Sequence, residues 1–458
     1  MRSDRRSFLA SVGLAGLAGV AGCLSQGDSD EATPSETEPP QTPVEPVDDE
    51  QYDLSVTHDV ENWAAYDPDW SHPVDAPNRD VEVETVVDGL AVPWDLAFAP
   101  NGDLFISERP GQILRYESGT VEAVASPDDI VEKSAIDDDE DGDWWSTGGE
   151  GGLMGIAVHP DYPDVPLVYA FYTYTDPSDS DNRLNKLVYY DVSTGEPSPT
   201  TLVDEIPGRK WHNGSRIAFG PANHLWVTTG DAGKPGLAQD PSSLAGKILR
   251  LNPDGTAPDD NPDLGGDPRV YTYGHRNPQG ITFTPDATPV ENEHGPSRHD
   301  EVNVLTAGGN YGWDVEGERA RTADTYAGTD FVRPVVNTTD ETWAPSGSVF
   351  YTGDAVPSWQ NRLIVSGLIS QRINVVTLYP ADGEVPSTAN GGQRFDADWL
   401  HDEYSAVHHT VLEDELGRIR HVEQGPDGAL YALTSNRDGR SDEFPVDGDD
   451  RLVRITPA

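Results

Sequence analysis

The sequence predicts an all-β domain, a six-bladed β-propeller, preceded by a signal segment with a lipobox and by a disordered acidic stalk. Three observations predict this fold class. A unit of two strand-like runs joined by a proline-containing turn recurs along the chain. Long helical periodicity is missing, and strands do not alternate with helices as they do in parallel-sheet enzymes. Blades of about four short strands with Gly and Pro turns explain all three observations.

The first 23 residues are typical of an export signal. Arg5 and Arg6 form a twin arginine, followed by Phe8, Leu9 and an apolar run that is too short for a comfortable membrane span. The run ends in Val-Ala-Gly-Cys at Cys23, which resembles a lipobox. We expect export in the folded state by the twin-arginine route and lipid attachment at Cys23 on the cell surface. A plain cleaved signal is the alternative.

The remaining chain divides into three parts. Residues 24–54 are rich in Ser, Thr, Pro, Gln, Glu and Asp, and such a segment cannot bury enough apolar surface to fold, so we expect a disordered linker. Residues 55–80 carry several aromatic side chains, and we interpret them as a lead-in strap that lies on the domain. Residues 81–458 form the predicted propeller.

The repeated unit is an apolar strand, a turn containing proline, and a second strand. Its clear copies are centred on Pro100, Pro160, Pro221, Pro285 and Pro426. A more degenerate copy, SVFYTGDAVPSWQNRLIVS, lies between the last two and brings the number of units to six. We expect the C-terminal segment DRLVRITPA to supply a closing strand to the first blade. Loops from all blades of a propeller meet at one end of a central channel, so residues far apart in sequence can share a site.

Composition excludes several classes of function. The formal net charge is -51, from 81 acidic and 30 basic residues, and only five of the basic residues are lysine. No basic face is available for nucleic acid or for an anionic bilayer, so the only membrane contact we expect is through the lipid anchor. A dense acidic surface with few lysines indicates a halophilic protein, and an acidic mesophilic protein is the alternative. A single cysteine excludes an intramolecular disulfide.

Two short strings place histidine, arginine and asparagine beside strand-like runs. In WHNGSRIAFGP, His212 lies at a loop-to-strand junction, where a histidine can face a pocket and act as a base near neutral pH. In YGHRNPQG, Arg276 offers a fork of donors to a carbonyl or alkoxide, and Asn277 adds a neutral donor. A structural histidine and an idle Asn-Pro turn are the alternatives. The presence of both strings favours a catalytic site.

Three further strings fit a bound anion and a hard metal ion. Arg418 and Arg420 alternate in a strand-like run and share a face, where they would repel unless an anion with two or more carboxylates lay between them. The bend at Gly295 and Pro296 can expose carbonyl oxygens that suit Ca²⁺, although most such pairs are only turns. Glu150, in a glycine-rich string without the Lys-Ser/Thr of a phosphate loop, would reach into the same pocket.

Taken together, these strings resemble a known family. GEGGLMGIAVHPDYP, WHNGSRIAFGP, YGHRNPQG, EHGP and RIRHVEQGPDGALYALT are similar, in order and spacing, to motifs of the soluble PQQ-dependent aldose (glucose) sugar dehydrogenases. The similarity runs from about residue 83 to the C-terminus. It implies a six-bladed propeller that oxidises aldose sugars at C1 to lactones, with PQQ and Ca²⁺ as cofactors and an external electron acceptor of unknown kind.

The resemblance also implies a role for each site residue. His212 would remove the proton from the C1 hydroxyl while hydride passes to PQQ, and Arg276 would polarise the quinone oxygen that gains charge. The carbonyls of Gly295 and Pro296 would hold Ca²⁺. The other implied cofactor contacts are Asn277, Thr342, Glu150, Arg418 and Arg420, the last two with PQQ carboxylates.

The sequence departs from the family pattern at three places. Trp211 precedes the implied base, where glucose-type members carry aspartate, and Ile369 or Ser370 occupies the region of the family's cofactor lysine. Substrate-stacking aromatics are not recognisable before Thr342. Two rival functions remain open. One is a calcium-dependent lactonase, which would need a carboxylate and asparagine cage, and the other is a non-catalytic propeller that binds a glycan or a protein partner.

Overall fold

The computed structural model describes residues 52–54, 58–131, 149–195, 197–314, 320–438, 440 and 448–458. The signal segment with Cys23, the stalk up to residue 51 and the acidic run 136–143 lie outside the described residues. The chain divides into two units, residues 1–39 and 40–458, and all described residues belong to the second. No helix in the described part is long and apolar enough to cross a lipid bilayer.

Six antiparallel sheets make up the described domain, as the sequence predicts, and we call each sheet a blade. The first blade orders β2 (Pro93–Phe98), β3 (Leu104–Glu108), β4 (Gln112–Glu117) and β5 (Thr120–Ala125). The second orders β6 (Leu153–Val158), β7 (Leu167–Thr175), β8 (Arg183–Asp191) and β9 (Thr200–Gly208). The third orders β10 (Ile217–Phe219), β11 (Leu225–Thr229), β12 (Lys247–Leu251) and β13 (Val270–Tyr273).

The last three blades follow the same plan with small variations. The fourth orders β14 (Pro278–Phe283), β15 (Pro289–Glu293), β16 (Glu301–Val304) and β17 (Val336–Asn337). The fifth orders β18 (Pro345–Tyr351), β19 (Arg362–Gly367), β20 (Ile373–Pro380), β22 (Tyr404–Val411) and β21 (Gln393–Phe395). The sixth orders β23 (Ile419–Gln424), β24 (Leu430–Thr434), β25 (Leu452–Pro457) and β1 (Val81–Val87). Short helices lie between strands: η1 (Val60–Asn62), η3 (Pro235–Gln239), α1 (Ala323–Tyr326) and η4 (Pro357–Trp359).

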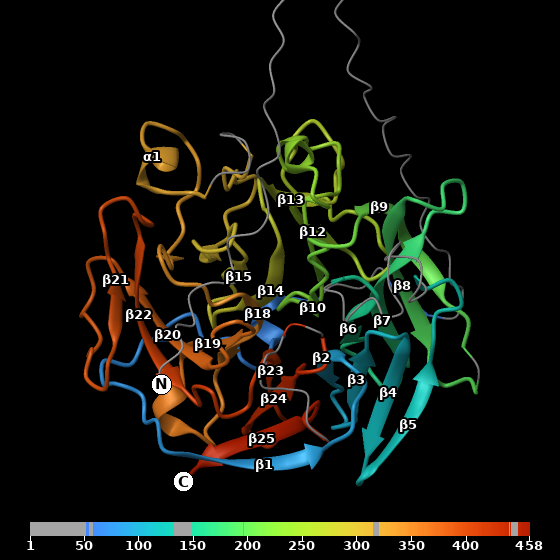
Figure 1. Ribbon diagram of the computed structural model, residues 1–458, viewed down its shortest axis with the longest axis horizontal. Helices are drawn as coiled ribbons and strands as arrows, with labels where there is room; N and C mark the ends of the chain where they lie inside the picture. The colour runs from blue at the N-terminus through green and yellow to red at the C-terminus, as the bar shows by residue number, and fades with distance from the viewer. Residues whose placement is uncertain are drawn as a thin grey trace, which may run out of the picture. The chain divides into compact units, whose positions relative to one another are not determined.

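The repeated proline-containing unit is confirmed, and its first strand is the innermost strand of a blade. The first strand of every blade lies near the centre of the ring (Figure 1). Pro100, Pro160, Pro221, Pro285 and Pro426 each come two residues after the end of such a strand, in the turn that leads to the second strand. The pattern therefore marks one fixed place in the fold, the end of the channel where inner strands finish.

The strand β1, near the N-terminus, closes the ring. The expectation that the C-terminal segment supplies the closing strand to the first blade is therefore wrong. β25 does not complete the first blade. It is the third strand of the sixth blade, and β1 pairs with it antiparallel as the outermost strand, from Val81 opposite Pro457 to Val87 opposite Leu452. β1 and β25 run side by side along one edge of the domain (Figure 1). Distant chain ends thus meet in one sheet.

The hydrophobic core is divided among the interfaces between neighbouring blades. Six clusters of buried apolar side chains are present in the described domain, and each draws mainly on two neighbouring blades. The cluster between the third and fourth blades, for example, packs Trp226 and Ile248 against Ile281 and Phe283. Because the alternating side chains of a strand point to opposite faces, each blade can contribute to both of its neighbours.

The described residues 58–80 lie across the end where inner strands finish. The backbone N–H of His58 donates to the carbonyl of Ala222, and that of Asp67 donates to the carbonyl of Pro285. Further along, the indole N–H of Trp359 donates to the carbonyl of Asn78. These contacts tie the segment to the third, fourth and fifth blades. They leave the opposite end of the channel, where the inner strands begin, uncovered by this segment.

Candidate active site

All the residues that the sequence assigns to a site lie at the end of the propeller where the inner strands begin. The loops that precede β6, β10, β14, β18 and β23 carry them: Glu150, His212, Arg276, Asn277, Thr342 and Arg418, with Arg420 inside β23. Gly295 and Pro296 follow β15, which runs antiparallel to β14 and so ends at the same side. The topology therefore brings together residues from five blades.

His212 is held in one orientation by a buried carboxylate. Its Nδ1 atom lies 2.8 Å from Oδ1 of Asp231, a fully buried residue in the loop after β11. The His212 side chain is 17% exposed, so its ring remains in contact with solvent. Because the carboxylate accepts the hydrogen of Nδ1, the other ring nitrogen, Nε2, carries the lone pair that a base needs.

Asp231 is itself fixed by three further contacts. Its Oδ2 accepts the indole N–H of Trp313 at 2.7 Å, and its Oδ1 also accepts the backbone N–H of Gly233 at 2.7 Å. The Asp231 backbone N–H donates to the carbonyl of Arg276 at 2.8 Å, which joins the third and fourth blades. The guanidinium of Arg276 lies 5.4 Å from the centre of the Trp313 ring. His212, Asp231 and Arg276 thus form one connected unit.

Arg418 and Arg420 share a face, as predicted, but the anion between them belongs to the protein. Oδ2 of Asp438 accepts Nη2 of Arg418 at 2.7 Å and Nη2 of Arg420 at 3.3 Å. Burial acts to raise the pKa of Asp438, but the two arginines outweigh it and hold this pKa below its ordinary value. The inference that a ligand must separate the two cations is therefore corrected, since Asp438 already does so.

Glu150 and two more arginines, Arg440 and Arg109, also belong to the charged residues of the site. The Glu150 carboxylate accepts the backbone N–H of His212 at 2.9 Å and Nη1 of Arg440 at 3.0 Å. Burial acts to raise the pKa of Glu150, but Arg440 and His212 outweigh it, so the carboxylate is ionised. Arg109 is buried and donates to the carbonyl of Gly151 at 3.1 Å. A Cβ atom at Gly151 would lie 2.7 Å from the hydroxyl oxygen of Thr173, so this position needs a glycine.

Positive charge exceeds negative charge in this pocket. Electrostatic interactions connect Arg109 with Asp438, Arg440, Glu150 and Arg418, and others connect Glu150 with Arg276. Burial lowers the pKa of Arg109 to about 10 and that of Arg420 to about 9, so both remain charged at neutral pH. The five arginines of the pocket face the two ionised carboxylates of Glu150 and Asp438 and the carboxylate that holds His212.

Several buried polar atoms of the pocket have no hydrogen-bond partner among the described residues. They are Nε of Arg276, Nδ2 of Asn277 and Nε of Arg420. Asn277 is fully buried, and its Oδ1 is already used by the backbone N–H of Gly214 at 3.0 Å. Buried donors without partners are costly, so they indicate a missing acceptor. A ligand with several carboxylate and carbonyl oxygens, as PQQ has, fits this donor set.

The bend at Gly295 and Pro296 is crowded with carbonyl oxygens. A Cβ atom at Gly295 would lie 2.0 Å from the carbonyl of Arg298 and 2.4 Å from that of His299, so only glycine fits. The carboxylate of Asp300 accepts the Gly295 N–H at 2.9 Å, and it also accepts the Thr342 hydroxyl at 3.3 Å. Thr342 therefore braces this bend. Carbonyl oxygens are ligands that suit Ca²⁺, and the carbonyls of Arg298 and His299 that crowd Gly295 are of this kind.

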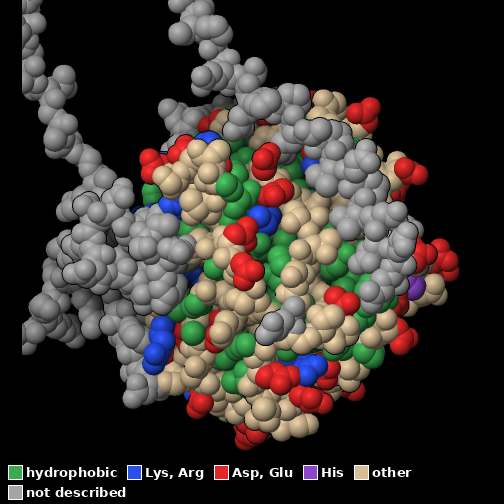
Figure 2. All heavy atoms as spheres, turned by 90° about the vertical axis from the view of Figure 1, so that its right-hand side faces the viewer, with side chains coloured by type: hydrophobic (Ala, Val, Ile, Leu, Met, Phe, Trp, Pro, Cys, Tyr) green, Lys and Arg blue, Asp and Glu red, His purple; other side chains and the backbone are tan. Residues whose placement is uncertain are grey.

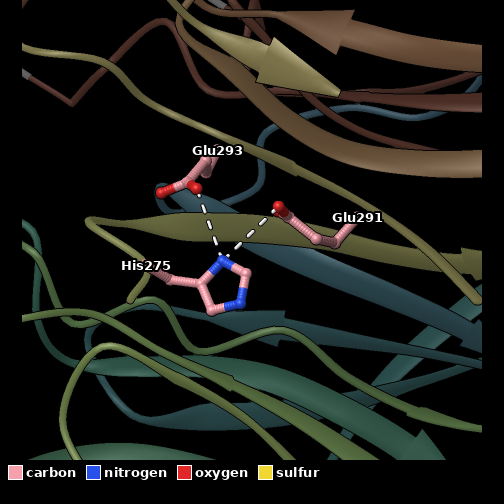
Figure 3. Close-up of side chains that lie close together, drawn as sticks. All are labelled: His275, Glu291 and Glu293. Atoms are coloured by element: carbon pink, nitrogen blue, oxygen red, sulfur yellow. Dashed lines mark hydrogen bonds and ion pairs between the residues drawn. The ribbon is translucent and has the colours of Figure 1, made fainter. Parts of the chain in front are cut away.

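A second cluster of ionisable groups lies buried beside this site (Figure 3). Figure 3 shows Nδ1 of His275 facing two carboxylates, at 3.6 Å from Glu291 and 3.4 Å from Glu293. The cationic partner of the cluster is Arg321, whose two terminal nitrogens lie 2.8 Å from Glu293 and 2.8 Å from Glu301. Arg321 neutralises the Glu293 carboxylate, while burial and the neighbouring charge of Glu293 raise the pKa of Glu291 well above its ordinary value, so we interpret the cluster as structural.

Sequence reasoning missed the residues that position the site rather than the residues that form it. Asp231 and Asp438 carry the contacts described above, and neither belongs to the strings singled out. Trp313 ends the family-like string DEVNVLTAGGNYGW, but sequence reasoning assigned it no role. Asp231 offered a usable signal, because it follows directly on the strand β11 in a Gly-Asp-Ala-Gly turn, where strand ends meet the site. Asp438 lies in a polar loop that resembles any other acidic loop of this chain.

Comparison with known proteins shows that the chain is similar to proteins described as sugar dehydrogenases. Residues 90–444 match the family model described as Glucose / Sorbosone dehydrogenase. The chain is 30% identical to the aldose sugar dehydrogenase YliI of Escherichia coli over 379 residues, 78% of this chain and 91% of that protein. It is 33% identical over 282 residues to quinoprotein glucose dehydrogenase B of Acinetobacter calcoaceticus, 55% of this chain and 56% of that protein.

Solved structures agree with the sequence matches. The PQQ-bound aldose sugar dehydrogenase of Streptomyces coelicolor has a TM-score of 0.63 and 34% sequence identity to this chain. The similarity covers 83% of this chain and 99% of that one. It therefore includes the whole of that propeller.

Proposed function

Because the chain belongs to the glucose/sorbosone dehydrogenase family, whose members include PQQ-dependent sugar dehydrogenases, we propose that it oxidises aldose sugars at C1 to lactones with PQQ and Ca²⁺. The observation that carries the proposal is the His212–Asp231 pair beside a pocket with an excess of arginine. A base fixed by a buried carboxylate and a cationic pocket meet the two needs of this reaction: proton removal and retention of an anionic cofactor.

His212 takes the proton from the C1 hydroxyl of the sugar. With Nδ1–H directed at Asp231, the lone pair on Nε2 accepts that proton, and the carboxylate stabilises the imidazolium that forms. The backbone of His212 is held by its N–H bond to Glu150. His212 also adopts a left-handed conformation, with φ of 62°, which a tight network must maintain. The base is therefore positioned before the substrate arrives.

The arginines hold and polarise the cofactor. PQQ, when bound, supplies the acceptor for the hydride from C1, and Ca²⁺ at the Gly295–Pro296 bend adds Lewis acidity. Arg276 offers its unpartnered Nε and fixed positive charge next to the base. Arg420 and Asn277 offer further unpartnered donors to cofactor oxygens, while Arg418 is the arginine more fully satisfied by Asp438. Arg109 and Arg440 add to the positive field.

The remaining features belong to the same proposal. Electrons pass to an external acceptor, and the protein is exported by the twin-arginine route and held at the cell surface by a lipid on Cys23. The acidic composition adapts it to high salt. These statements rest on the sequence, and mass spectrometry of the native N-terminus tests the anchor. A mature chain that starts beyond Cys23 would contradict it.

A titration of metal-stripped protein with PQQ and Ca²⁺ in high salt tests the function. Quinone absorbance reports binding, and dye reduction after addition of a panel of aldoses reports turnover. We expect stoichiometric binding, followed by bleaching with at least one aldose. Failure to bind PQQ would show that the residues at the place of the family lysine, Ile369 and Ser370, are decisive. The chain would then be better explained as a non-catalytic glycan-binding or partner-binding propeller, or as a lactonase.

A further inference from the structure

Trp211 is the most informative surface residue of the site. It precedes the base directly and is 40% exposed. The other large hydrophobic side chains that are exposed in the described part are aliphatic: Val74, Val83, Val121, Ile369 and Val385. The exposed part of the indole leaves apolar area in water that a ligand could cover.

The backbone on both sides of Trp211 is clamped. The Glu150 N–H donates to the carbonyl of Lys210 at 2.7 Å, and the Glu150 carboxylate accepts the N–H of His212 at 2.9 Å. The side chain of Asn213 closes the turn, because it accepts the N–H of Arg209 at 3.0 Å and donates to its carbonyl at 2.8 Å. Trp211 therefore lies at the tip of a rigid five-residue turn, and its exposure does not come from a loose loop.

The indole is also supported from the protein side. The Arg209 guanidinium lies 5.5 Å from the centre of the Trp211 ring, within the range of a cation–π contact. A Cβ atom at Gly233 would lie 3.0 Å from the indole nitrogen, so the glycine makes room for the ring. Gly233 belongs to the same turn as Asp231, which orients the base. One turn thus supports both the base and the indole beside it.

We propose that Trp211 is the platform on which the pyranose ring of the substrate stacks while its C1 hydroxyl reaches His212. This inference rests on the proposed function and deepens it. The C–H groups on one face of a pyranose form an apolar surface that matches the negative face of an aromatic ring, and the hydroxyls at the rim stay free for polar contacts. A rigid aromatic side chain binds such a face at a low cost in conformational entropy.

The chemistry of the platform favours a cyclic, neutral aldose. Stacking uses the closed ring, which is the form that carries the C1 hydroxyl to be oxidised. The platform contacts the substrate equally in the ground state and in the transition state, so it contributes to KM more than to kcat. Trp211 thus determines specificity, whereas His212 performs the chemistry.

Kinetics of three variants test the proposal in the PQQ- and Ca²⁺-loaded enzyme with a dye acceptor. Trp211→Ala is expected to raise KM for the best aldose about tenfold, with kcat changed less than about threefold. Trp211→Phe keeps an aromatic face and is expected to restore most of the affinity. Val385→Ala removes an exposed apolar side chain in the loop between β20 and β21 and is the control, with kinetics unchanged.

Fluorescence of the apo protein gives a second readout that does not need turnover. Titration with the same aldose is expected to change the tryptophan emission of the wild type, and Trp211→Phe is expected to abolish that change. An unchanged KM in Trp211→Ala, or a changed KM for the dye alone, would overturn the platform while leaving the proposed function intact. If the wild type binds no PQQ, the proposed function fails, and a Trp211-dependent emission change with a pyranose decides the platform independently.

Discussion

At the scale of single residues, the site depends on buried carboxylates that hold other side chains in place. Asp231 fixes the tautomer of His212 and also receives the indole N–H of Trp313, so one buried side chain connects the base to the Arg276 loop. Asp438 separates two arginines that would otherwise repel. Each carboxylate is buried and hydrogen-bonded. Burying a charge lowers the stability of the fold, so we infer that these carboxylates are present because they position the side chains around them.

The substitution Asp231→Asn tests this positioning role. An amide can donate to Nδ1 and so stabilise the tautomer in which Nε2 carries the hydrogen and cannot act as a base. We expect kcat to fall by roughly 10³-fold or more, as for other oriented histidine bases, with PQQ affinity unchanged. The matched control is Asp240→Asn, an exposed acid of the same loop. A kcat within threefold of the wild type would show that His212 is oriented by something else.

At the scale of elements, the prediction from sequence was correct for the inner strands of the blades and wrong for the strand that closes the ring. The five proline landmarks mark turns of fixed geometry, and the strands before them repeat one pattern, so the number and order of blades could be read directly. The pairing of β1 with β25 could not be predicted in this way. An alternating sequence such as VEVETVV indicates a strand, but it does not identify the strand with which it pairs. The positioning residues were missed for a similar reason. Asp231 and His212 are brought together by two loops whose contact only the folded ring creates.

The β1–β25 pairing predicts that β1 stabilises the whole ring. Without β1, the outer edge of β25 is unpaired and the sixth blade has three strands. We compare a protein lacking residues 1–79, which keeps β1, with one lacking residues 1–88. The second is expected to have a melting temperature lower by on the order of 10 °C and a less cooperative transition. Equal melting curves for the two proteins would contradict a closing role. The comparison removes the effect of losing the strap, which is absent from both.

The fourth blade carries a pH dependence that can be isolated. Burial raises the pKa of Glu301 from 4.5 to about 7 despite its contact with Arg321. The native state therefore holds a proton that the unfolded state releases above pH 4.5. The stability this provides is complete below that pH and is lost as the pH rises through 7.

Glu301→Gln removes the titration. Relative to the variant, the wild type is expected to lose up to about 3 kcal/mol of unfolding free energy between pH 5 and pH 8. Urea denaturation at four pH values in constant salt measures this difference. Changes in packing and in hydrogen bonds of the neutral side chain give an offset that does not vary with pH, so the slope with pH is the quantity that matters. Parallel stability curves would show that Glu301 is ionised in the native state throughout this range.

At the scale of the whole molecule, charge is distributed in opposite ways inside and outside. The chain has a net charge of -51, and acidic side chains are spread over the face in Figure 2 with few basic ones among them. The site at the channel mouth instead gathers arginines from several blades. An acidic surface repels the multiply anionic cofactor of the proposed function. The positive charge of the site therefore acts on the cofactor at short range. Salt lets the cofactor approach because it screens the negative charge of the surface carboxylates.

Stability is therefore expected to rise with salt. The Debye length falls from about 10 Å at 0.1 M to about 3 Å at 1 M, which screens repulsion among the surface carboxylates. We expect the melting temperature to increase steadily between 0.1 and 3 M NaCl. Scanning calorimetry at fixed pH measures this, with sucrose series as the control for effects unrelated to charge. A flat dependence on NaCl would favour the alternative of an acidic protein without adaptation to salt.

The pairing of the first strand with the last has a consequence for how the protein is made. At about 5–20 residues per second, β25 leaves the ribosome some 20–90 s after synthesis begins, and β1 has no partner for most of that time. An unpaired strand edge invites aggregation. The glutamates that alternate along β1, Glu82 and Glu84, are exposed even in the finished fold. We expect their charge to oppose aggregation of the unpaired strand, and we expect β1 and β25 to pair late in folding.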